Sequence, residues 1–388
     1  MIIEPKSRGF ICTTAHPTGC HHNVLSQINY VKSKSALVKK PKHVLVIGGS
    51  TGYGLASRIV ATYAGGAKTI AVSFERPATE KRTATAGWYN TAAFEKIAHA
   101  DQHYAKSLNG DAFSQDMKQQ TVALIRQDFG KVDCVIYSLA SPRRQMPDGS
   151  IAQSVLKPVG AAYRNKTINP ETGEVSEISL EPATPEEIAD TVKVMGGGDW
   201  QDWIDYLQAE NVLAADAITC AYSYVGPVLT HAIYKNWTIG HAKDHLLRTA
   251  HSLDDRLKKT GGRAFVSVNK AVVTQASAAI PVVPLYISIL FKLMKAKGTH
   301  EGCIEQMYRL FHDLVYTGND IPMDEAHRVR VDDLEMQPDI QQAISDIWKK
   351  VSTENVADFA DLAGYRHDFF ELFGFGVAGV DYQADVEI

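Results

Sequence analysis

The chain has few cysteines, and they are not arranged as a disulfide framework or a zinc site would require. Five occur among 388 residues: Cys12, Cys20, Cys134, Cys220 and Cys303. Their number is odd and no C-x-x-C pair is present, which is typical of reduced thiols in a cytoplasmic protein. The histidines around Cys20 have no carboxylate or second cysteine at a familiar ligand spacing, so we expect no metal site.

Excess charge and long apolar runs are also absent. The formal net charge of −4 argues against a nucleic-acid-binding surface. The longest apolar stretch, Ile280 to Phe291, contains two prolines and is too short to span a bilayer. We expect it to form a buried helix that could also line a pocket for an acyl chain. The first residues include Glu4 and Arg8 and no long apolar run, so no secretory signal is expected.

The strongest positive signal is the glycine-rich segment VLVIGGSTGYGLASRI, from Val44 to Ile59. It passes from a short apolar strand through Gly48, Gly52 and Gly54 into the start of a helix. Glycines in such a turn permit positive φ and a close backbone approach to a pyrophosphate, and the N–H groups of the next helix attract phosphates. The segment predicts a dinucleotide-binding loop, although short glycine motifs also occur without a ligand.

An acidic residue after the next apolar strand indicates which dinucleotide is favoured. The strand Thr69 to Phe74 is followed by Glu75, about twenty residues beyond the loop, where a carboxylate accepts hydrogen bonds from the adenosine ribose. Because a carboxylate repels a 2′-phosphate, NADH is favoured over NADPH. The adjacent Arg76 leaves NADPH open, since a guanidinium can pair with that phosphate.

Strands and helices alternate from Lys42 onward, which predicts an α/β fold with a doubly wound, mostly parallel Rossmann-type sheet and helices on both faces. We expect one large domain over residues 1–388, in which residues 1–40 form an N-terminal extension packed on the core. The expected strands are 44–47, 69–74, 132–140 and one from 263, and the expected helices are 53–63, 88–106 and 113–129.

Residues 142–200 differ from the rest because they are polar and rich in turn-forming residues. They include a candidate hairpin at 166–180 around the sequence NPETG. We interpret this stretch as a small insertion that caps the active site at the carboxyl edge of the sheet, where ligands bind in such folds.

The catalytic pair of ordinary short-chain dehydrogenases, a Tyr and a Lys four positions apart on one helix, is missing from its usual place. That spacing occurs only at Tyr30 and Lys34, before the first strand. Tyr234 and Lys243 are better candidates, although each also fits an ordinary core tyrosine or solvated lysine. On one continuous helix they would face opposite sides, so we expect Tyr234 to be non-helical and a helix to begin near His241.

The chain resembles the FabV-type trans-2-enoyl reductases, which comprise enoyl-ACP reductases and trans-2-enoyl-CoA reductases. The resemblance covers essentially the whole chain and is carried by the Tyr-x8-Lys spacing and by the segments GGSTGYG, SFERP, YSLASP, AYSYVG, VTQASAAIPVVPLY and DFFELFGFGVAGVDYQADV. It implies the NADH-dependent reduction of the trans-2 double bond of an enoyl thioester in fatty-acid biosynthesis.

The resemblance also implies roles for single residues. Tyr234 would donate to the thioester oxygen, Lys243 would bind cofactor phosphate or ribose, and Tyr224 would contact the thioester end of the substrate. The residues expected to bind the cofactor are Gly48, Ser50, Gly52, Tyr53, Gly54, Phe74, Glu75, Asp111, Ala112, Ser138, Leu139, Ala140, Lys243, Val273, Thr274 and Gln275.

Two other functions stay open on the sequence alone. A carbonyl reductase acting on 3-ketoacyl substrates is disfavoured by the absence of a correctly placed Tyr–Lys pair. A non-catalytic NAD-binding redox sensor would have no need of Tyr234 or Lys243. The residues do not decide whether the acyl thioester partner is carried by acyl-carrier protein or by CoA, and the resemblance favours a monomer.

Overall fold

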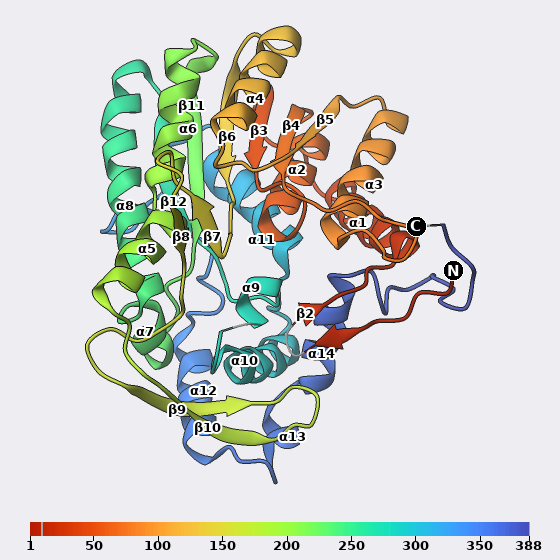
Figure 1. Ribbon diagram of the computed structural model, residues 1–388, viewed down its shortest axis with the longest axis vertical. Coiled ribbons are helices and arrows are strands. Elements are labelled where there is room, and N and C mark those ends of the chain that lie inside the picture. The colour runs from red at the N-terminus through yellow and green to blue at the C-terminus, as the bar shows by residue number, and fades with distance from the viewer. Residues whose placement is uncertain (9–10, 279, 388) are drawn as a thin grey trace.

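A seven-stranded parallel sheet forms the centre of the molecule (Figure 1). The computed structural model describes residues 1–8, 11–278 and 280–387. The strand order is β13-β12-β11-β6-β3-β4-β5, with β3 (His43–Ile47), β4 (Lys68–Ser73), β5 (Ala105–Asn109), β6 (Val132–Tyr137), β11 (Leu213–Ser223), β12 (Arg263–Val268) and β13 (Arg328–Arg330). The chain forms β3 first and continues to β4 and β5 on one side of it. It then returns to form β6 on the other side, so a topological switch point lies between β3 and β6. The predicted Rossmann-type fold is confirmed.

Helices cover both faces of this sheet, and β3 shows why its sequence is continuously apolar. Val44 and Val46 pack among the helices of one face, and Leu45 and Ile47 among those of the other, because successive side chains point to opposite faces. The first face carries α1 (Pro17–Lys32), α2 (Gly52–Tyr63), α3 (Ala86–Ala100), α11 (Cys303–Arg309) and the π-helix Leu310–Val315. The second carries α4 (Gln115–Asp128), α6 (Gly198–Ala209) and α8 (Thr238–Leu257), which runs into a 3-10 turn, Lys258–Thr260.

A third apolar cluster lies beyond the carboxyl edge of the sheet and surrounds α10 (Val283–Lys297). Figure 1 shows α10 below the sheet, with the β9–β10 hairpin and α12 beside it. The predicted burial of the apolar run is confirmed, since Leu285, Ile289 and Leu290 are fully enclosed. The surrounding elements are β9 (Tyr163–Ile168), β10 (Val175–Leu180), α7 (Val228–Tyr234), α9 (Gln275–Ala278), α12 (Pro338–Lys350), α13 (Val356–Phe359) and α14 (Leu362–Glu371).

The segments expected to lie outside the sheet have structure of their own. The strands β1 (Ser7–Arg8) and β2 (Ile11–Cys12) pair near the N-terminus, and α1 packs on α2 and α3. The stretch 142–200 contains the hairpin of β7 (Arg143–Gln145) and β8 (Ile151–Gln153), the predicted antiparallel hairpin β9–β10, and α5 (Pro185–Met195), which packs on α8. No helix in the described part of the chain is long and apolar enough to cross a membrane.

Three strands of the central sheet were not expected, namely β5, β11 and the short edge strand β13. The predicted helix 88–106 ends at Ala100, and β5 follows it. Its sequence AKSLN alternates poorly because β5 is an edge strand with half-exposed side chains. The strand β11 is central, but its register shifts between Leu213 and Ile218, and the alanines and Asp216 between these two residues do not form a strand pattern.

Candidate active site

The predicted site residues follow successive strands at one edge of the sheet. Gly48 comes directly after β3, Phe74 after β4, Asp111 soon after β5 and Ser138 directly after β6. Tyr224 comes directly after β11. Because all seven strands are parallel, these positions lie along the carboxyl edge, on both sides of the switch point between β3 and β6.

Each glycine of the loop has a separate structural reason. A Cβ on Gly48 (φ +87°) would lie 2.3 Å from the carbonyl oxygen of Ser138, and one on Gly54 would lie 1.9 Å from that of Gly48. The loop, β6 and the first turn of α2 therefore pack backbone against backbone. Gly52 instead needs its positive φ of 54° and faces open space. No side chain caps α2 at Thr51, so its first N–H groups suit a pyrophosphate.

Glu75 is tied to the glycine loop. Its Oε1 accepts from the Ser50 hydroxyl at 2.6 Å, and its Oε2 accepts from the Thr85 hydroxyl at 2.5 Å. A Cβ on Gly87 would overlap this carboxylate, so the side chain is enclosed by small residues. An ionised carboxylate has about four lone-pair sites, and the ones left over can accept from ribose hydroxyls.

The other residues expected at the adenosine end differ in what they offer. Phe74 exposes 75% of its surface, and an aromatic ring left in water beside such a loop suits stacking against a base. Asp111 is half-buried and accepts from the Phe113 N–H, while Ala112 is buried. Farther along the edge, the Ser138 N–H donates to the carbonyl oxygen of Ile47. The next two residues are less enclosed, since Leu139 is half-buried and Ala140 is exposed.

Tyr53 does not face the phosphate side of the loop. Its hydroxyl lies 2.7 Å from the carbonyl oxygen of Lys270 and 3.1 Å from the side-chain oxygen of Gln306. The N–H of Lys270 donates to that same Gln306 oxygen at 2.7 Å. The Tyr53 ring therefore fastens the glycine-loop helix to the segment after β12, and only its backbone is placed to contact phosphate.

That segment carries the residues expected near the nicotinamide. Val273 is buried, Thr274 is half-buried and Gln275 is exposed. The Thr274 N–H donates to the Ser277 hydroxyl at 2.9 Å, and the Ser277 N–H donates back to the Thr274 hydroxyl at 3.0 Å. These bonds cap the start of α9, which sets the direction of the Val273 and Thr274 backbone.

Tyr234 and Lys243 come from two helices that meet at the end of β11. Tyr234 is the last residue of α7, and α8, which carries Lys243, begins at Thr238. The prediction of a break between them is right. The prediction of a non-helical Tyr234 and a helix start near His241 is wrong, because Pro227 starts a separate short helix and Trp237 precedes the next.

The Tyr234 and Lys243 side chains both contact residues at the carboxyl end of β11. The Tyr234 ring packs edge-on against Tyr224, with centroids 4.5 Å apart. The Lys243 ammonium donates to the carbonyl oxygen of Tyr222 at 3.2 Å. Among the described residues, none hydrogen-bonds to the Tyr234 hydroxyl. Tyr224, Tyr234 and Lys243 thus all lie at the carboxyl end of β11.

Burial shifts the pKa values of both groups toward their neutral forms. It raises the pKa of the Tyr234 phenol, with a further contribution from the charge of Glu335, and it lowers the pKa of Lys243 to about 8. Tyr234 is therefore protonated, and can donate a hydrogen bond, over the whole physiological range. Lys243 changes charge close to neutral pH, and an anionic ligand would favour its charged form.

Glu335 is a site residue that sequence reasoning did not find. It is fully buried, and the Tyr224 hydroxyl donates to its carboxylate at 2.7 Å. It lies in the polar sequence DDLEMQ between β13 and α12. No motif marks it, and a single glutamate in such a sequence is ordinarily solvated.

Comparison with known families bears on this geometry. The chain matches three family models: the NAD(P)H binding domain of trans-2-enoyl-CoA reductase at residues 2–80, the trans-2-enoyl-CoA reductase catalytic region at 82–316, and an enoyl reductase FAD binding domain at 323–386. The chain belongs to the trans-2-enoyl-CoA reductase family. The resemblance to enoyl reductases predicted from the sequence is confirmed.

Relatives within the family are similar over their full lengths. An NADH enoyl-acyl-carrier-protein reductase of Flavobacterium johnsoniae is 58% identical over 99% of this chain and 97% of its own. Its counterpart in Opitutus terrae is 59% identical over 100% and 98%. The crystal structure of Treponema denticola trans-2-enoyl-CoA reductase in complex with NAD is 50% identical, covers 100% of this chain and 98% of its own, and superposes with a TM-score of 0.96.

The third family model names FAD, but the residues that it matches do not fit the diphosphate of a flavin dinucleotide. Such a diphosphate binds where a strand turns through glycines into an open helix N-terminus. Within residues 323–386, all of which the structure describes, the one strand, β13, leads to Asp332 and Asp333, and α12 starts at Pro338 with Asp339 in its first turn. Carboxylates at these places repel a diphosphate.

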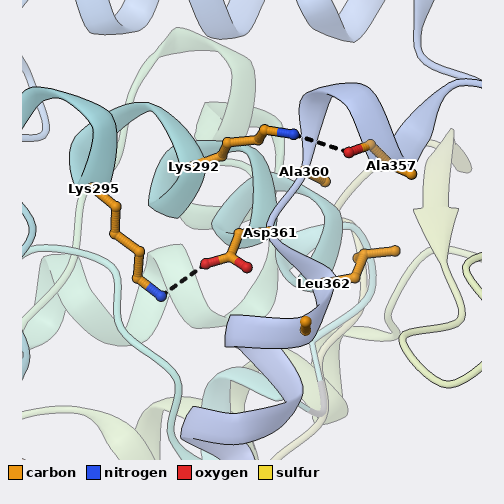
Figure 2. A pocket seen from close by; sticks show the side chains of 7 residues that line it. Lys292, Lys295, Ala357, Ala360, Asp361 and Leu362 are labelled. Atoms are coloured by element: carbon orange, nitrogen blue, oxygen red, sulfur yellow. Dashed lines mark hydrogen bonds and ion pairs between the residues drawn. The ribbon is translucent and has the colours of Figure 1, made fainter.

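A groove beside this segment does not change that conclusion. It lies between α10 and the C-terminal helices and has a volume of about 440 Å³ (Figure 2). Its two cations are already engaged, since Lys292 donates to the carbonyl oxygen of Ala357 at 2.9 Å and Lys295 to Asp361 at 2.8 Å. Asp361 also caps α14. No step of the reaction is therefore assigned to a flavin.

Proposed function

We propose that this protein reduces the trans-2 double bond of enoyl thioesters with NADH and forms the saturated acyl thioesters of fatty-acid biosynthesis. The observation that carries the proposal is that Tyr234 and Lys243 come from two separate helices and both contact residues at the end of β11. An ordinary short-chain carbonyl reductase would place both on one helix, four positions apart.

The residues divide the chemistry between them. When bound, NADH supplies the hydride that reaches Cβ of the enoyl group. Negative charge then develops on the thioester oxygen, and the Tyr234 hydroxyl donates a hydrogen bond to it. Protonation at Cα completes the saturated product. Lys243 supplies positive charge near the phenol and a donor for the cofactor.

The glycine loop and Glu75 support NADH as the cofactor. The diphosphate has uncapped N–H groups at the start of α2, and Glu75 is held beside the loop by Ser50 and Thr85. A carboxylate fixed at that place repels the 2′-phosphate of NADPH. The relatives from Flavobacterium and Opitutus carry NADH in their names, and the Treponema enzyme was solved with NAD.

We further propose that acyl-carrier protein is the natural carrier and that the chain acts as a monomer. The relatives named for the acyl-carrier protein are 58% and 59% identical to this chain, whereas the Treponema CoA enzyme is 50% identical. The carrier is tested by comparing kcat/KM for the same trans-2-enoyl group on acyl-carrier protein and on CoA. The monomeric state is tested by light scattering during gel filtration.

The decisive experiment follows NADH oxidation with crotonyl-CoA, trans-2-dodecenoyl-ACP and acetoacetyl-CoA. We expect rapid oxidation with the two enoyl substrates, little with acetoacetyl-CoA, and a much smaller rate with NADPH. Mass spectrometry should show the enoyl thioester gaining two hydrogens. Preferential reduction of acetoacetyl-CoA would instead support a carbonyl reductase, and unaltered thioesters with tight NADH binding would support a redox sensor.

A further inference from the structure

A buried carboxylate from the C-terminal part of the chain accepts a hydrogen bond from Tyr224, the neighbour of the proposed catalytic tyrosine. Glu335 has no exposed surface, and three donors converge on its two oxygens. The hydroxyls of Tyr224 and Tyr286 both donate to Oε1, at 2.7 and 2.6 Å, and the Ala271 N–H donates to Oε2 at 2.7 Å. An ionised carboxylate, which only accepts hydrogen bonds, is suited to this arrangement.

The three donors belong to three parts of the site. Tyr224 follows β11 and packs against the ring of Tyr234. Ala271 begins the segment that leads to Val273 and the other residues expected near the nicotinamide. Tyr286 belongs to α10. One side chain therefore fixes the substrate side and the cofactor side of the site relative to each other.

The bond to Glu335 also determines what Tyr224 can do. A phenol has one proton, and Tyr224 gives it to the carboxylate, so toward a substrate or toward Tyr234 its oxygen can only accept. Tyr234 has no hydrogen-bond partner among the described residues and keeps its proton for the substrate. Glu335 thus separates the roles of two neighbouring phenols.

The backbone is shaped to keep Tyr224 in this orientation. Gly226 has a φ of +68°, and a Cβ there would lie 2.8 Å from both Cε1 and the hydroxyl oxygen of Tyr224. Since real Cβ atoms do not approach so closely, a side chain at this position would press on the Tyr224 ring and, at 2.3 Å, on the Thr230 hydroxyl. Glycine two residues after Tyr224 therefore leaves room for the ring in the orientation that reaches Glu335.

Burying a carboxylate is unfavourable unless its partners compensate. Here three donors compensate, and an apolar residue in place of Glu335 alone would leave the Tyr224 and Tyr286 hydroxyls and the Ala271 N–H without a partner inside the α10 cluster. Beyond stability, the carboxylate provides one fixed acceptor for Tyr224 and Ala271.

We propose that Glu335 is a positioning residue of the reductase: it holds Tyr224 as a hydrogen-bond acceptor beside Tyr234 and fixes the cofactor segment at Ala271. The inference rests on the proposed function, and it makes the C-terminal segment a part of the active site. It predicts that Glu335 acts on turnover through Tyr224.

The test is a double-mutant cycle of Glu335→Gln and Tyr224→Phe, with trans-2-enoyl-CoA and NADH as substrates. Glutamine keeps the size and an acceptor for the Ala271 N–H but presents an N–H to the phenols. The matched control is Asp254→Asn. Asp254 is another buried carboxylate, which accepts from the Ala264 N–H at 2.9 Å at the opposite end of β12.

We expect Glu335→Gln to lower kcat about 10- to 100-fold, the range for a lost charge-assisted hydrogen bond. In the Tyr224→Phe background the same change should lower kcat less than about threefold, because the partner is already gone. The dissociation constant for NADH, measured by fluorescence, should stay within about twofold of wild type. Asp254→Asn should lower the melting temperature and leave kcat near wild type.

A kcat of Glu335→Gln close to wild type, or equal losses in both backgrounds, would overturn the inference while wild-type activity upholds the proposed function. A wild-type protein that reduces no enoyl thioester would overturn both. Should Glu335→Gln not fold, Gly226→Ala crowds the Tyr224 ring, together with the Thr230 hydroxyl, from within the same segment. It should reproduce the loss of kcat, and unchanged turnover in that variant would also overturn the inference.

Discussion

At the scale of single residues, burial keeps the Tyr234 phenol protonated, so that it can donate a hydrogen bond. Because burial raises its pKa, Tyr234 remains a neutral donor at the end of α7. We expect Tyr234→Phe to lower kcat by at least about a hundredfold, as loss of one oxyanion donor does, while NADH binding is retained. Tyr30→Phe is the matched control, since Tyr30 and Lys34 have the four-residue spacing but precede the sheet. Steady-state kinetics and NADH fluorescence measure both effects, and near-normal turnover of Tyr234→Phe would remove this residue from catalysis.

Lys243 gives the site a dependence on pH. Burial lowers the pKa of its ammonium group to about 8, so the charged form predominates below that pH and is lost as pH rises through it. We expect NADH affinity to fall several-fold between about pH 7 and about pH 9, because only the ammonium form attracts the cofactor. Fluorescence titrations measure this trend. In Lys243→Arg the charge persists, and the trend should vanish. If the NADH affinity of the wild-type protein does not change over this pH range, the charge of Lys243 does not attract the cofactor.

At the scale of elements, the corner between α7 and α8 allows a pair nine positions apart to reach one site. Gly240, in the first turn of α8, lies against the end of α7, and a Cβ there would be 2.3 Å from the carbonyl oxygen of Lys235. Gly240→Ala should therefore push Tyr234 out of place and lower kcat about tenfold or more, since small misplacements are costly. His241→Ala, on the exposed side of the same turn, is the control. Equal kinetics for the two variants would show that the corner tolerates the shift.

The elements also show what the sequence could and could not predict. The glycine loop, β3 and α2 were predictable because their signals are local: an apolar run, glycines and a helical period within one segment. The position of Tyr234 was predicted only in part, since the chemistry required a break but the residues did not show that a second helix precedes it. The strand β5 is polar because it lies at an edge, which no local pattern reveals. Glu335 reaches Tyr224 over 111 residues of sequence, so only the tertiary fold identifies it.

At the scale of the whole molecule, the boundaries of the family models do not coincide with independent folding units. The apolar cluster around α10 combines residues matched by the catalytic-region model, such as Ile289, with Ile344 and Phe369 from the segment matched by the FAD binding model. The two ends of the chain also meet, since the His16 N–H donates to the carbonyl oxygen of Phe373 at 2.8 Å. The C-terminal segment is therefore part of the core and, through Glu335, reaches the site.

This arrangement predicts the behaviour of a shortened chain. A fragment of residues 1–322 keeps every residue expected to bind the cofactor or to act in catalysis, yet it exposes the α10 cluster and removes Glu335. The free energy lost when this apolar surface is exposed exceeds the free energy of unfolding of an ordinary domain. We expect the fragment to lack a cooperative thermal transition in circular dichroism and to oxidise no NADH with crotonyl-CoA. A chain ending at Gln383 removes only residues beyond the last helix and should melt and turn over like the full-length protein. Cooperative melting with activity in the 1–322 fragment would show that the C-terminal segment is a separate, dispensable unit.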